Sequence, residues 1–424
     1  MNHRHDPPSL PKGFTSVPLV ENWLGGFPGG NGKPLDALQG EEEKGGDRDA
    51  FSGTSSVSQF SSYSNPAERE AAMRNANDLP LRRIPLEEFL ALPSVDPATT
   101  LLVQDLSTIN QKIGVLPRVL KPLFESQRSI LDYLNDAMFT TSAVVGDSLA
   151  ESNKNLEFQH KRLLRIRKSS LQCSDPARPV CWAEWDNKVH APILELALDT
   201  VPVSDQAPVF HNIKDEKIAV LFRDPNALLR DDLADYGIFL APAIASPLGS
   251  LITSSMRNSR YLARFNALEN FEVDRPLAIA IETNRSRAGD ANAPNRLANF
   301  ARAHFRVVRH LFRHLNLNIR TRETAAAETQ PSTIPKPPAS PPMLPLPLIE
   351  VVGSAWRISF AILDEDHVIV SSDLAMGSTE QVSDCYVLFQ SLVRLVRWTE
   401  SECTAWWTGR LQESFKQASF RYVR

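Results

Sequence analysis

Two short runs of apolar residues constrain the fold of this chain more than any other feature of its sequence. Residues 236–240 and 277–281 are almost continuously apolar, and each run is bounded by charged residues or proline. Runs of this length and flanking are typical of strands that are covered on both faces. The sequence therefore predicts a central sheet with helices packed on both sides.

The segments around these runs extend the same pattern. Alternating or apolar segments predict further strands at 208–213, 348–352, 356–363 and 368–372. Apolar residues at spacings of three and four predict helices at 178–199, 293–317 and 379–415. Helices and strands thus alternate along the chain, which describes an α/β domain with helices flanking a mixed central sheet.

The remaining composition suggests how the 424 residues are divided. Residues 1–80 are rich in Gly, Ser, Pro, Asn and charge, which predicts a disordered tail. Residues 81–172 predict a helical N-terminal region, because leucines recur at helical spacing between 115 and 170. The α/β domain is expected over 173–418, with a proline-rich insertion at 321–347 that cannot hold a helix or a central strand.

The net charge of −4 hides two basic segments. Residues 154–168 contain six Lys or Arg and one acidic residue, and residues 296–322 contain seven Arg and no acidic residue. Segments of this kind mark either a phosphate-binding surface or the solvated faces of helices, and charge alone leaves both readings open.

The sequence also favours an intracellular protein, in the nucleus or the cytoplasm. It contains no run of 18 apolar residues, and its first residues have no apolar stretch of the kind found in secretory signals. The four cysteines include no CxxC pair and are too few to cross-link a chain of this length, which suits a reducing compartment. We therefore expect neither secretion nor a membrane partner.

Two acidic residues adjoin the two apolar runs. Asp235 precedes the first run, and Glu282 follows the second. If the strands are neighbours, both carboxylates can lie at one end of them, and hard oxygen ligands of this kind suit Mg²⁺ beside a phosphate. The alternative is that both residues are ordinary polar ends of strands.

Neighbouring segments make this arrangement more specific. Six stretches form an ordered set of motifs: 183–194 (A-E-W-D-N-K-V-H-A-P-I-L), 234–238 (A-D-Y-G-I), 275–285 (R-P-L-A-I-A-I-E-T-N-R), 296–305 (R-L-A-N-F-A-R-A-H-F), 376–379 (M-G-S-T) and 392–398 (L-V-R-L-V-R-W). Together they resemble the fungal PD-(D/E)XK nuclease-like domain family. The resemblance extends from about residue 174 to residue 407, and it rests on the order and spacing of the motifs more than on any single one.

The resemblance implies a restriction-endonuclease-like core in which Asp235 and Glu282 hold Mg²⁺ and Glu184 is an auxiliary carboxylate. The sequence departs from the family pattern at two positions. Asn284 stands where the family has a lysine that orients or activates water, and Arg296 stands where a helix glutamine usually faces the site. Either Arg296 or Lys188 supplies the missing cation, or the fold is retained and the chemistry is lost.

The leading hypothesis from the sequence is a PD-(D/E)XK nuclease-like protein that hydrolyses phosphodiester bonds of DNA or RNA with Mg²⁺. In it Asp235, Glu282, Glu184, Asn284 and Arg296 form the catalytic site. The activity is weakened because Asn284 replaces the lysine. The alternative is a catalytically inactive nuclease-like module that binds nucleic acid or serves as a protein scaffold. The oligomeric state stays open, and the residues expected to contact phosphate lie on the second basic segment: Arg302, Arg306 and Arg309.

Three histidines of that segment carry less weight. His304 lies on the apolar stripe of the expected helix, where a lone histidine is more often packed than catalytic. His310 and His314 have the i, i+4 spacing of metal ligands, but no third ligand stands near them in the sequence. We expect a packing role for the first and a solvated basic face for the other two.

Overall fold

The computed structural model describes residues 79–125, 134–140, 149–175, 177, 182–202, 204–205, 207–223, 234–258, 263–284, 293–327 and 343–419. All of them belong to one compact unit, which extends over residues 65–424. The tail expected at 1–80 lies almost wholly outside the described residues and stays a prediction. The insertion expected at 321–347 is wrong at both ends. Helix α10 (Ala293–Ala327) continues into it, because residues 321–327 contain no proline, and strand β5 (Leu346–Val352) begins before it ends. The residues between these two elements lie largely outside the described part, so there the insertion stays a prediction.

The described strands form one mixed sheet of eight strands in the order β1-β7-β6-β5-β4-β3-β2, and β8 pairs with β6. The pairs β4–β5 and β1–β7 are parallel, and the other pairs are antiparallel. The strands are β1 (Leu81–Ile84), β2 (Pro208–Asn212), β3 (Tyr236–Leu240), β4 (Leu277–Asn284), β5 (Leu346–Val352), β6 (Ala355–Asp364), β7 (His367–Ser371) and β8 (Leu374–Ser378).

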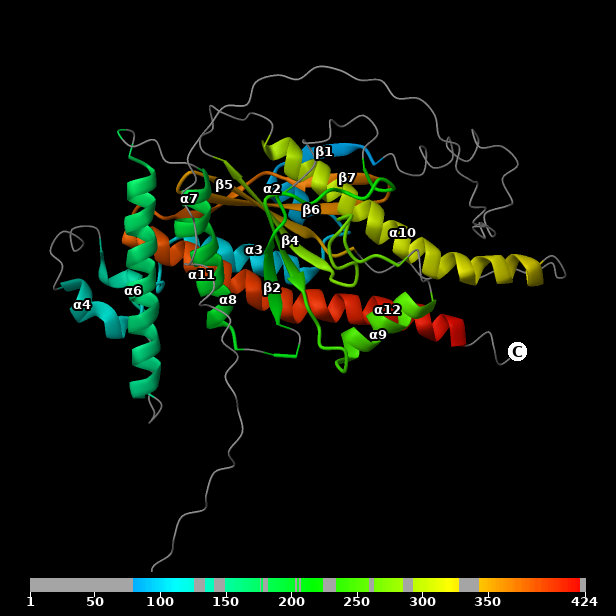
Figure 1. Ribbon diagram of the computed structural model, residues 1–424, viewed down its shortest axis with the longest axis horizontal. Helices are drawn as coiled ribbons and strands as arrows, with labels where there is room; N and C mark the ends of the chain where they lie inside the picture. Colours follow the sequence, from blue (N-terminus) through cyan, green and yellow to red (C-terminus); the bar gives the residue numbers. More distant parts are fainter. Residues whose placement is uncertain are drawn as a thin grey trace, which may run out of the picture. The chain divides into compact units, whose positions relative to one another are not determined.

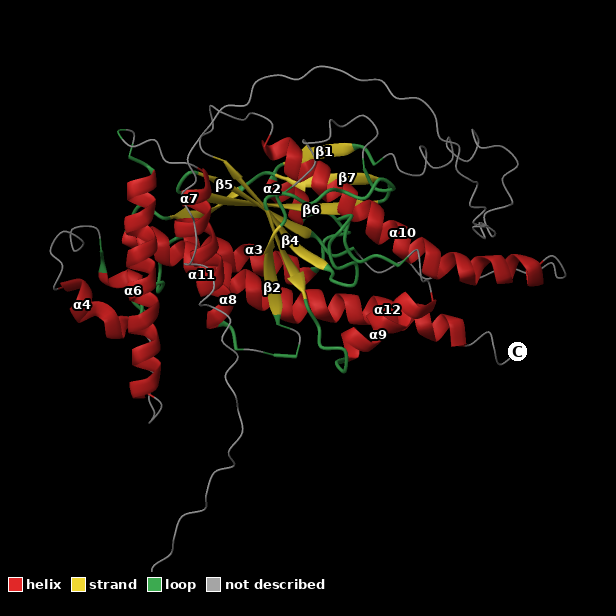
Figure 2. Ribbon diagram, in the orientation of Figure 1, coloured by secondary structure: helices red, strands yellow, loops and turns green. Residues whose placement is uncertain are grey.

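Helices surround this sheet (Figure 1, Figure 2). Two of the helical stretches contain π-helical turns, η3 (Asp186–His190) and η4 (Thr399–Cys403). The principal helices are α3 (Pro97–Asn110), α4 (Lys121–Glu125), α6 (Leu149–Cys173), α7 (Trp182–Trp185), α8 (Ala191–Thr200), α9 (Pro247–Asn258), α10 (Ala293–Ala327), α11 (Val382–Trp398) and α12 (Thr404–Ser419). Shorter helical pieces are α2 (Leu86–Leu90), η1 (Arg118–Leu120) and η2 (Asp136–Met138).

Both faces of the sheet are buried, as the two apolar runs predicted. On β5, Ile349 and Val351 join the apolar cluster that contains α3, α8 and α11, whereas Leu346 and Leu348 join the cluster that contains Leu297 on α10. Successive residues of a strand point to opposite faces, so continuous apolar runs are needed when both faces are covered. The predicted α/β fold, a mixed sheet flanked by helices, is confirmed.

The structure changes the division of the chain that the sequence suggested. The segment expected to be a helical N-terminal region, residues 81–172, contributes β1, which pairs in parallel with β7 over four residues. Its α3 and α6 pack on α11 of the α/β domain. This segment is therefore part of the sheet and its helical cover, and no boundary separates it from residue 173 onward.

None of the described helices combines the length and the apolar character that crossing a membrane requires.

Gly377 provides a test of how closely β8 and α11 are packed. Its φ is +115°, and an added Cβ would lie 2.7 Å from the Asp384 carbonyl oxygen and from the Leu388 amide nitrogen. We expect Gly377→Ala to lower the free energy of unfolding by about 2–5 kcal/mol, because the change combines backbone strain with a clash. Urea denaturation at pH 7 measures this.

Gly409 on α12 is the matched control. A Cβ there meets nothing within 4 Å. Gly409→Ala should leave stability unchanged or raise it by up to about 1 kcal/mol, because alanine favours a helix interior. Equal losses in both variants would contradict the close packing of Gly377.

Candidate functional site

The acidic residues singled out from the sequence lie at one end of two neighbouring strands. β3 and β4 are antiparallel, with Tyr236 opposite Ile281, so Asp235 just before β3 lies beside the end of β4 that carries Glu282. The Asp235 amide donates to the Ile281 carbonyl at 2.8 Å, which continues the pairing by one residue. The two apolar strands therefore bring both carboxylates to the same edge of the sheet.

Glu282 is bound by a cation from the protein itself. Its side chain is 3% exposed and forms an ion pair with Arg296, in the first turns of α10. The Nε of Arg296 donates to Glu282 Oε1 at 2.8 Å, and Nη2 donates to the same oxygen. Arg296 Nη2 also donates to Asn284 Oδ1 at 3.2 Å. Because Glu282 and Asn284 share one face of β4, a single guanidinium contacts both.

Asp235 is held by a different group of residues. Its Oδ2 accepts the Thr283 amide at 2.8 Å and also the Thr283 hydroxyl. Alternation along β4 places the Thr283 side chain on the face opposite to Glu282. The Lys214 ammonium, just after β2, lies 4.0 Å from Asp235 Oδ1. The two carboxylates therefore have separate cations.

A second aspartate, Asp186, completes the group around Lys214. Lys214 forms an ion pair with Asp186 and lies over the Tyr236 ring, 5.4 Å from its centroid. Asp186 Oδ1 is also bonded to His190 Nδ1 at 3.2 Å across the π-helical turn η3. Burial acts to raise the pKa of Asp186, but hydrogen bonds from His190, Lys214 and Tyr236 lower it below its usual range. Burial and the Asp186 charge raise the pKa of Tyr236.

Glu184 and Lys188 form an ion pair of their own, with Lys188 Nζ 2.9 Å from Glu184 Oε1. Both side chains are partly exposed, at 30% and 48% respectively. Their positions on α7 and η3 give the i, i+4 spacing of a surface helix pair. The auxiliary role of Glu184 and the rescue by Lys188 thus stay predictions.

The three arginines expected to contact phosphate have protein partners. Arg302 Nε donates to the Leu79 carbonyl at 2.8 Å, and Arg309 forms an ion pair with Asp366 at 2.6 Å. Arg306 is 5% exposed and donates to the Phe222 carbonyl at 3.1 Å. The phosphate contact expected of Arg306 is therefore corrected, because its guanidinium is buried and donates to a backbone carbonyl.

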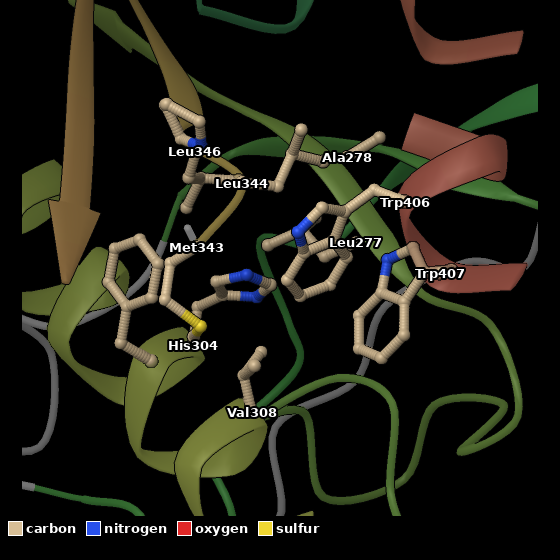
Figure 3. A pocket seen from close by; sticks show the side chains of 11 residues that line it. Leu277, Ala278, His304, Val308, Met343, Leu344, Leu346, Trp406 and Trp407 are labelled. Atoms are coloured by element: carbon tan, nitrogen blue, oxygen red, sulfur yellow. The ribbon is translucent and has the colours of Figure 1, made fainter. Parts of the chain in front are cut away.

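A small apolar pocket lies at the other end of β4 (Figure 3). His304 on α10 points into it, is 5% exposed, and has no hydrogen-bond partner at Nδ1 within the described part of the chain. Burial lowers the pKa of His304 to about 4, so the ring is neutral at pH 7. The pocket is lined by Leu277, Ala278, His304, Phe305, Val308, residues 343–346, Trp406 and Trp407.

This pocket is separate from the carboxylates. Leu277 begins β4 and Glu282 lies five residues further along, which is about 16 Å of extended strand. The lining is apolar apart from the imidazole, so the structure gives His304 a packing role. His310 packs edge-on against Phe222, with ring centroids 5.7 Å apart, and the side chain of His314 lies outside the described residues.

The fold and the strand-end acids together define a protein of the restriction-endonuclease-like class. A family model described as "PD-(D/E)XK nuclease superfamily" matches residues 128–404, well over half of the chain. The chain belongs to this superfamily. Comparison with curated proteins and with solved structures gives no match.

Nucleases of this superfamily typically use divalent metal ions, but the donor set here does not fit one. Glu282 Oε1 accepts two N–H groups of Arg296, and Asn284 offers one neutral oxygen that is bonded to the same guanidinium. Asp235 Oδ2 accepts two hydrogen bonds from Thr283. Among the described residues, no three His, Cys, Asp or Glu side chains gather as a metal ion would require.

Sequence reasoning missed Asp186, Lys214 and Tyr236. Asp186 lies two residues after Glu184, and its i, i+4 spacing to His190 is visible in the sequence. Lys214 is a lone lysine after a strand and carries no motif. Only the pairing of β2 with β3, in which Asn212 lies opposite Tyr236, brings it to this end of the sheet.

The Arg296–Glu282 pair gives a stability prediction. We expect Arg296→Gln to lower the free energy of unfolding by about 3–5 kcal/mol, because it leaves a buried carboxylate without its cation. The double variant Glu282→Gln with Arg296→Gln should be less destabilised than the two single losses combined. Urea denaturation of the four proteins at pH 7 gives the coupling energy. Strictly additive losses would contradict a direct pair.

His304 gives a pH prediction. Its pKa is about 4 in the folded protein and ordinarily about 6.5, so only the unfolded chain binds a proton between these values. The neutral His304 side chain therefore stabilises the folded protein fully above pH 6.5. The free energy of unfolding falls by about 2 kcal/mol between pH 6.5 and pH 5, because the unfolded chain gains a proton there. Urea denaturation should show that His304→Leu removes this part of the pH dependence. If the pH dependence of the free energy of unfolding is the same in His304→Leu as in the wild type, other histidines cause it.

Proposed function

We propose that this protein is a nuclease-fold module that binds nucleic acid without metal-dependent hydrolysis of its backbone. The observation that carries the proposal is the Arg296 guanidinium, which is bonded to Glu282 and to Asn284. It occupies one of the two carboxylates that would hold a metal ion. It also binds the residue that replaces the lysine of the family pattern.

The chemistry of these residues supports the proposal. An asparagine carries no charge and cannot accept a proton, and a guanidinium stays protonated at every physiological pH. Lys214 is a cation near Asp235, but it also forms the ion pair with Asp186. Electrostatic stabilisation of a phosphoryl transition state is worth several kcal/mol. The replacement of the family lysine by Asn284 and of the glutamine by Arg296 should therefore reduce phosphodiester hydrolysis to a negligible rate.

Nucleic acid is the proposed partner because nucleases of this superfamily act on it and the chain carries two strongly basic segments. The motif stretches quoted above support a place among the fungal members of the superfamily. Cysteine usage supports the nucleus or the cytoplasm as its location. Magnesium-dependent hydrolysis by Asp235 and Glu282 is the alternative, since both carboxylates lie at the same edge of the sheet.

Restoring the family pattern tests the proposal. Wild type should not cleave single-stranded, double-stranded or structured DNA or RNA with Mg²⁺ or Mn²⁺. The double variant Asn284→Lys with Arg296→Gln exchanges the two departures for the family residues and keeps one cation beside Glu282. We expect this variant to cleave with Mg²⁺ or Mn²⁺ at a rate about 100-fold above the background measured with wild type, the scale of one restored electrostatic contact.

The control adds Glu282→Gln to the double variant, and any gain should then disappear. Metal-dependent cleavage by the wild type that is lost in Asp235→Asn would contradict the proposal and favour the magnesium enzyme. An inert double variant would show that the loss of activity involves more than these two positions. Failure of the wild type to bind any of the nucleic acids would leave the protein-scaffold reading.

A further inference from the structure

Helix α6 (Leu149–Cys173) presents a straight line of cations to solvent. Residues 154, 161, 165 and 168 follow one another at spacings of seven, four and three, which places them within about 60° of arc on an α-helix of 3.6 residues per turn. Over about 21 Å of helix the exposed stripe contains Lys154, Lys161, Arg165 and Lys168. Beside the stripe, Glu157 lies 4.0 Å from Lys161, whose side chain is 75% exposed.

The opposite face of α6 fixes this orientation. His160, Leu163, Ile166 and Ser170 are buried. His160 Nδ1 is 3.0 Å from the Tyr386 hydroxyl, and the Ser170 hydroxyl is 2.6 Å from that of Thr379. The buried side of the helix thus packs against α11, and the cationic stripe faces outward. A helix held in this way has no apolar face left to insert into a lipid bilayer.

An exposed aromatic ring flanks the stripe. Phe158 is 58% exposed, and its position is 40° from that of Lys154 around the helix. The Arg162 guanidinium lies 5.8 Å from the centroid of its ring. A large aromatic ring among exposed cations is the combination that binds unpaired bases, because the ring stacks on a base while the cations contact phosphates.

This stripe differs from the basic segment that the sequence favoured. On α10, Arg302, Arg306 and Arg309 donate to Leu79, Phe222 and Asp366 respectively. The α6 cations, by contrast, are exposed. Helix α6 also packs against α7 and η3, the segments that carry Glu184 and Asp186.

We infer that α6 is the surface on which this protein binds single-stranded nucleic acid. Lys154, Lys161, Arg165 and Lys168 contact successive phosphates, and Phe158 stacks on a base. The inference rests on the proposed function, because it names the surface and the substrate class through which the module binds.

Two charge-matched variants of the full chain test the stripe. The first removes the four cations with Lys154→Gln, Lys161→Gln, Arg165→Gln and Lys168→Gln. The second removes four exposed cations from other elements, so that it has the same net charge: Lys217→Gln, Arg257→Gln, Arg397→Gln and Lys416→Gln. Fluorescence anisotropy with 20-nucleotide DNA and RNA single strands is measured over a range of salt concentrations.

The stripe variant should bind at least tenfold more weakly at low salt. The slope of the logarithm of its association constant against the logarithm of the salt concentration should be less steep by about 3. The control variant should keep the wild-type slope. Phe158→Ala should weaken binding of single strands about tenfold with the salt slope unchanged, and it should have little effect on a duplex of the same length. Unfolding midpoints of all variants should match, because every substituted side chain is exposed.

The outcomes distinguish a failure of the α6 surface from a failure of the proposed function. If the wild type binds single strands and the stripe variant binds like its control, the α6 surface is wrong while the proposed function stands. If the wild type binds no nucleic acid, the proposed function itself fails. Binding to vesicles with anionic lipid that depends on the stripe, without binding to oligonucleotides, would overturn the inference in favour of a membrane surface.

Discussion

The burial of the Glu282 charge is the constraint on which the rest of this site depends. A carboxylate that is 3% exposed near the end of β4, a central strand of the sheet, needs a compensating cation, because an uncompensated buried charge costs several kcal/mol. A bound metal ion would satisfy that need, and here Arg296 satisfies it from the first turns of α10. The same contact joins the first turns of α10 to β4, and α10 also carries His304 into its pocket and Arg306 into the interior.

Lys214 repeats this arrangement on the other face of β4, where its ammonium lies between Asp186 and Asp235. The acids at this edge of the sheet are thus bound by cations that belong to the fold. Such cations supply a fixed positive charge, as a metal ion would, but they offer no bound water and no exchangeable coordination position. The described site therefore keeps its electrostatic balance with protein cations, which is the basis for proposing that this fold binds nucleic acid without hydrolysing it.

Much of the fold was readable from the sequence, because strands covered on both faces and the helix at 293–317 leave strong local patterns. The features that the sequence did not reveal depend on contacts between residues that are far apart in the chain. β1 is four residues with two arginines, and only its parallel partner β7, nearly 290 residues further along the chain, makes it a strand. Arg306 was expected to contact phosphate because its actual partner, the Phe222 carbonyl, is 84 residues away in the chain. In the site, motifs pointed to Asp235, Glu282 and Arg296, whereas Lys214 and Asp186 meet only through the register of β2 and β3 and a π-helical turn.

The central claim is that protein cations, and not a metal ion, balance the strand-end carboxylates. Isothermal titration calorimetry of the wild type with Mn²⁺ and Mg²⁺, beside Glu282→Gln, tests it most directly. The account predicts no saturable binding by the wild type at millimolar metal, and the same flat titration for the variant. Stoichiometric binding of either ion by the wild type that disappears in Glu282→Gln would contradict it.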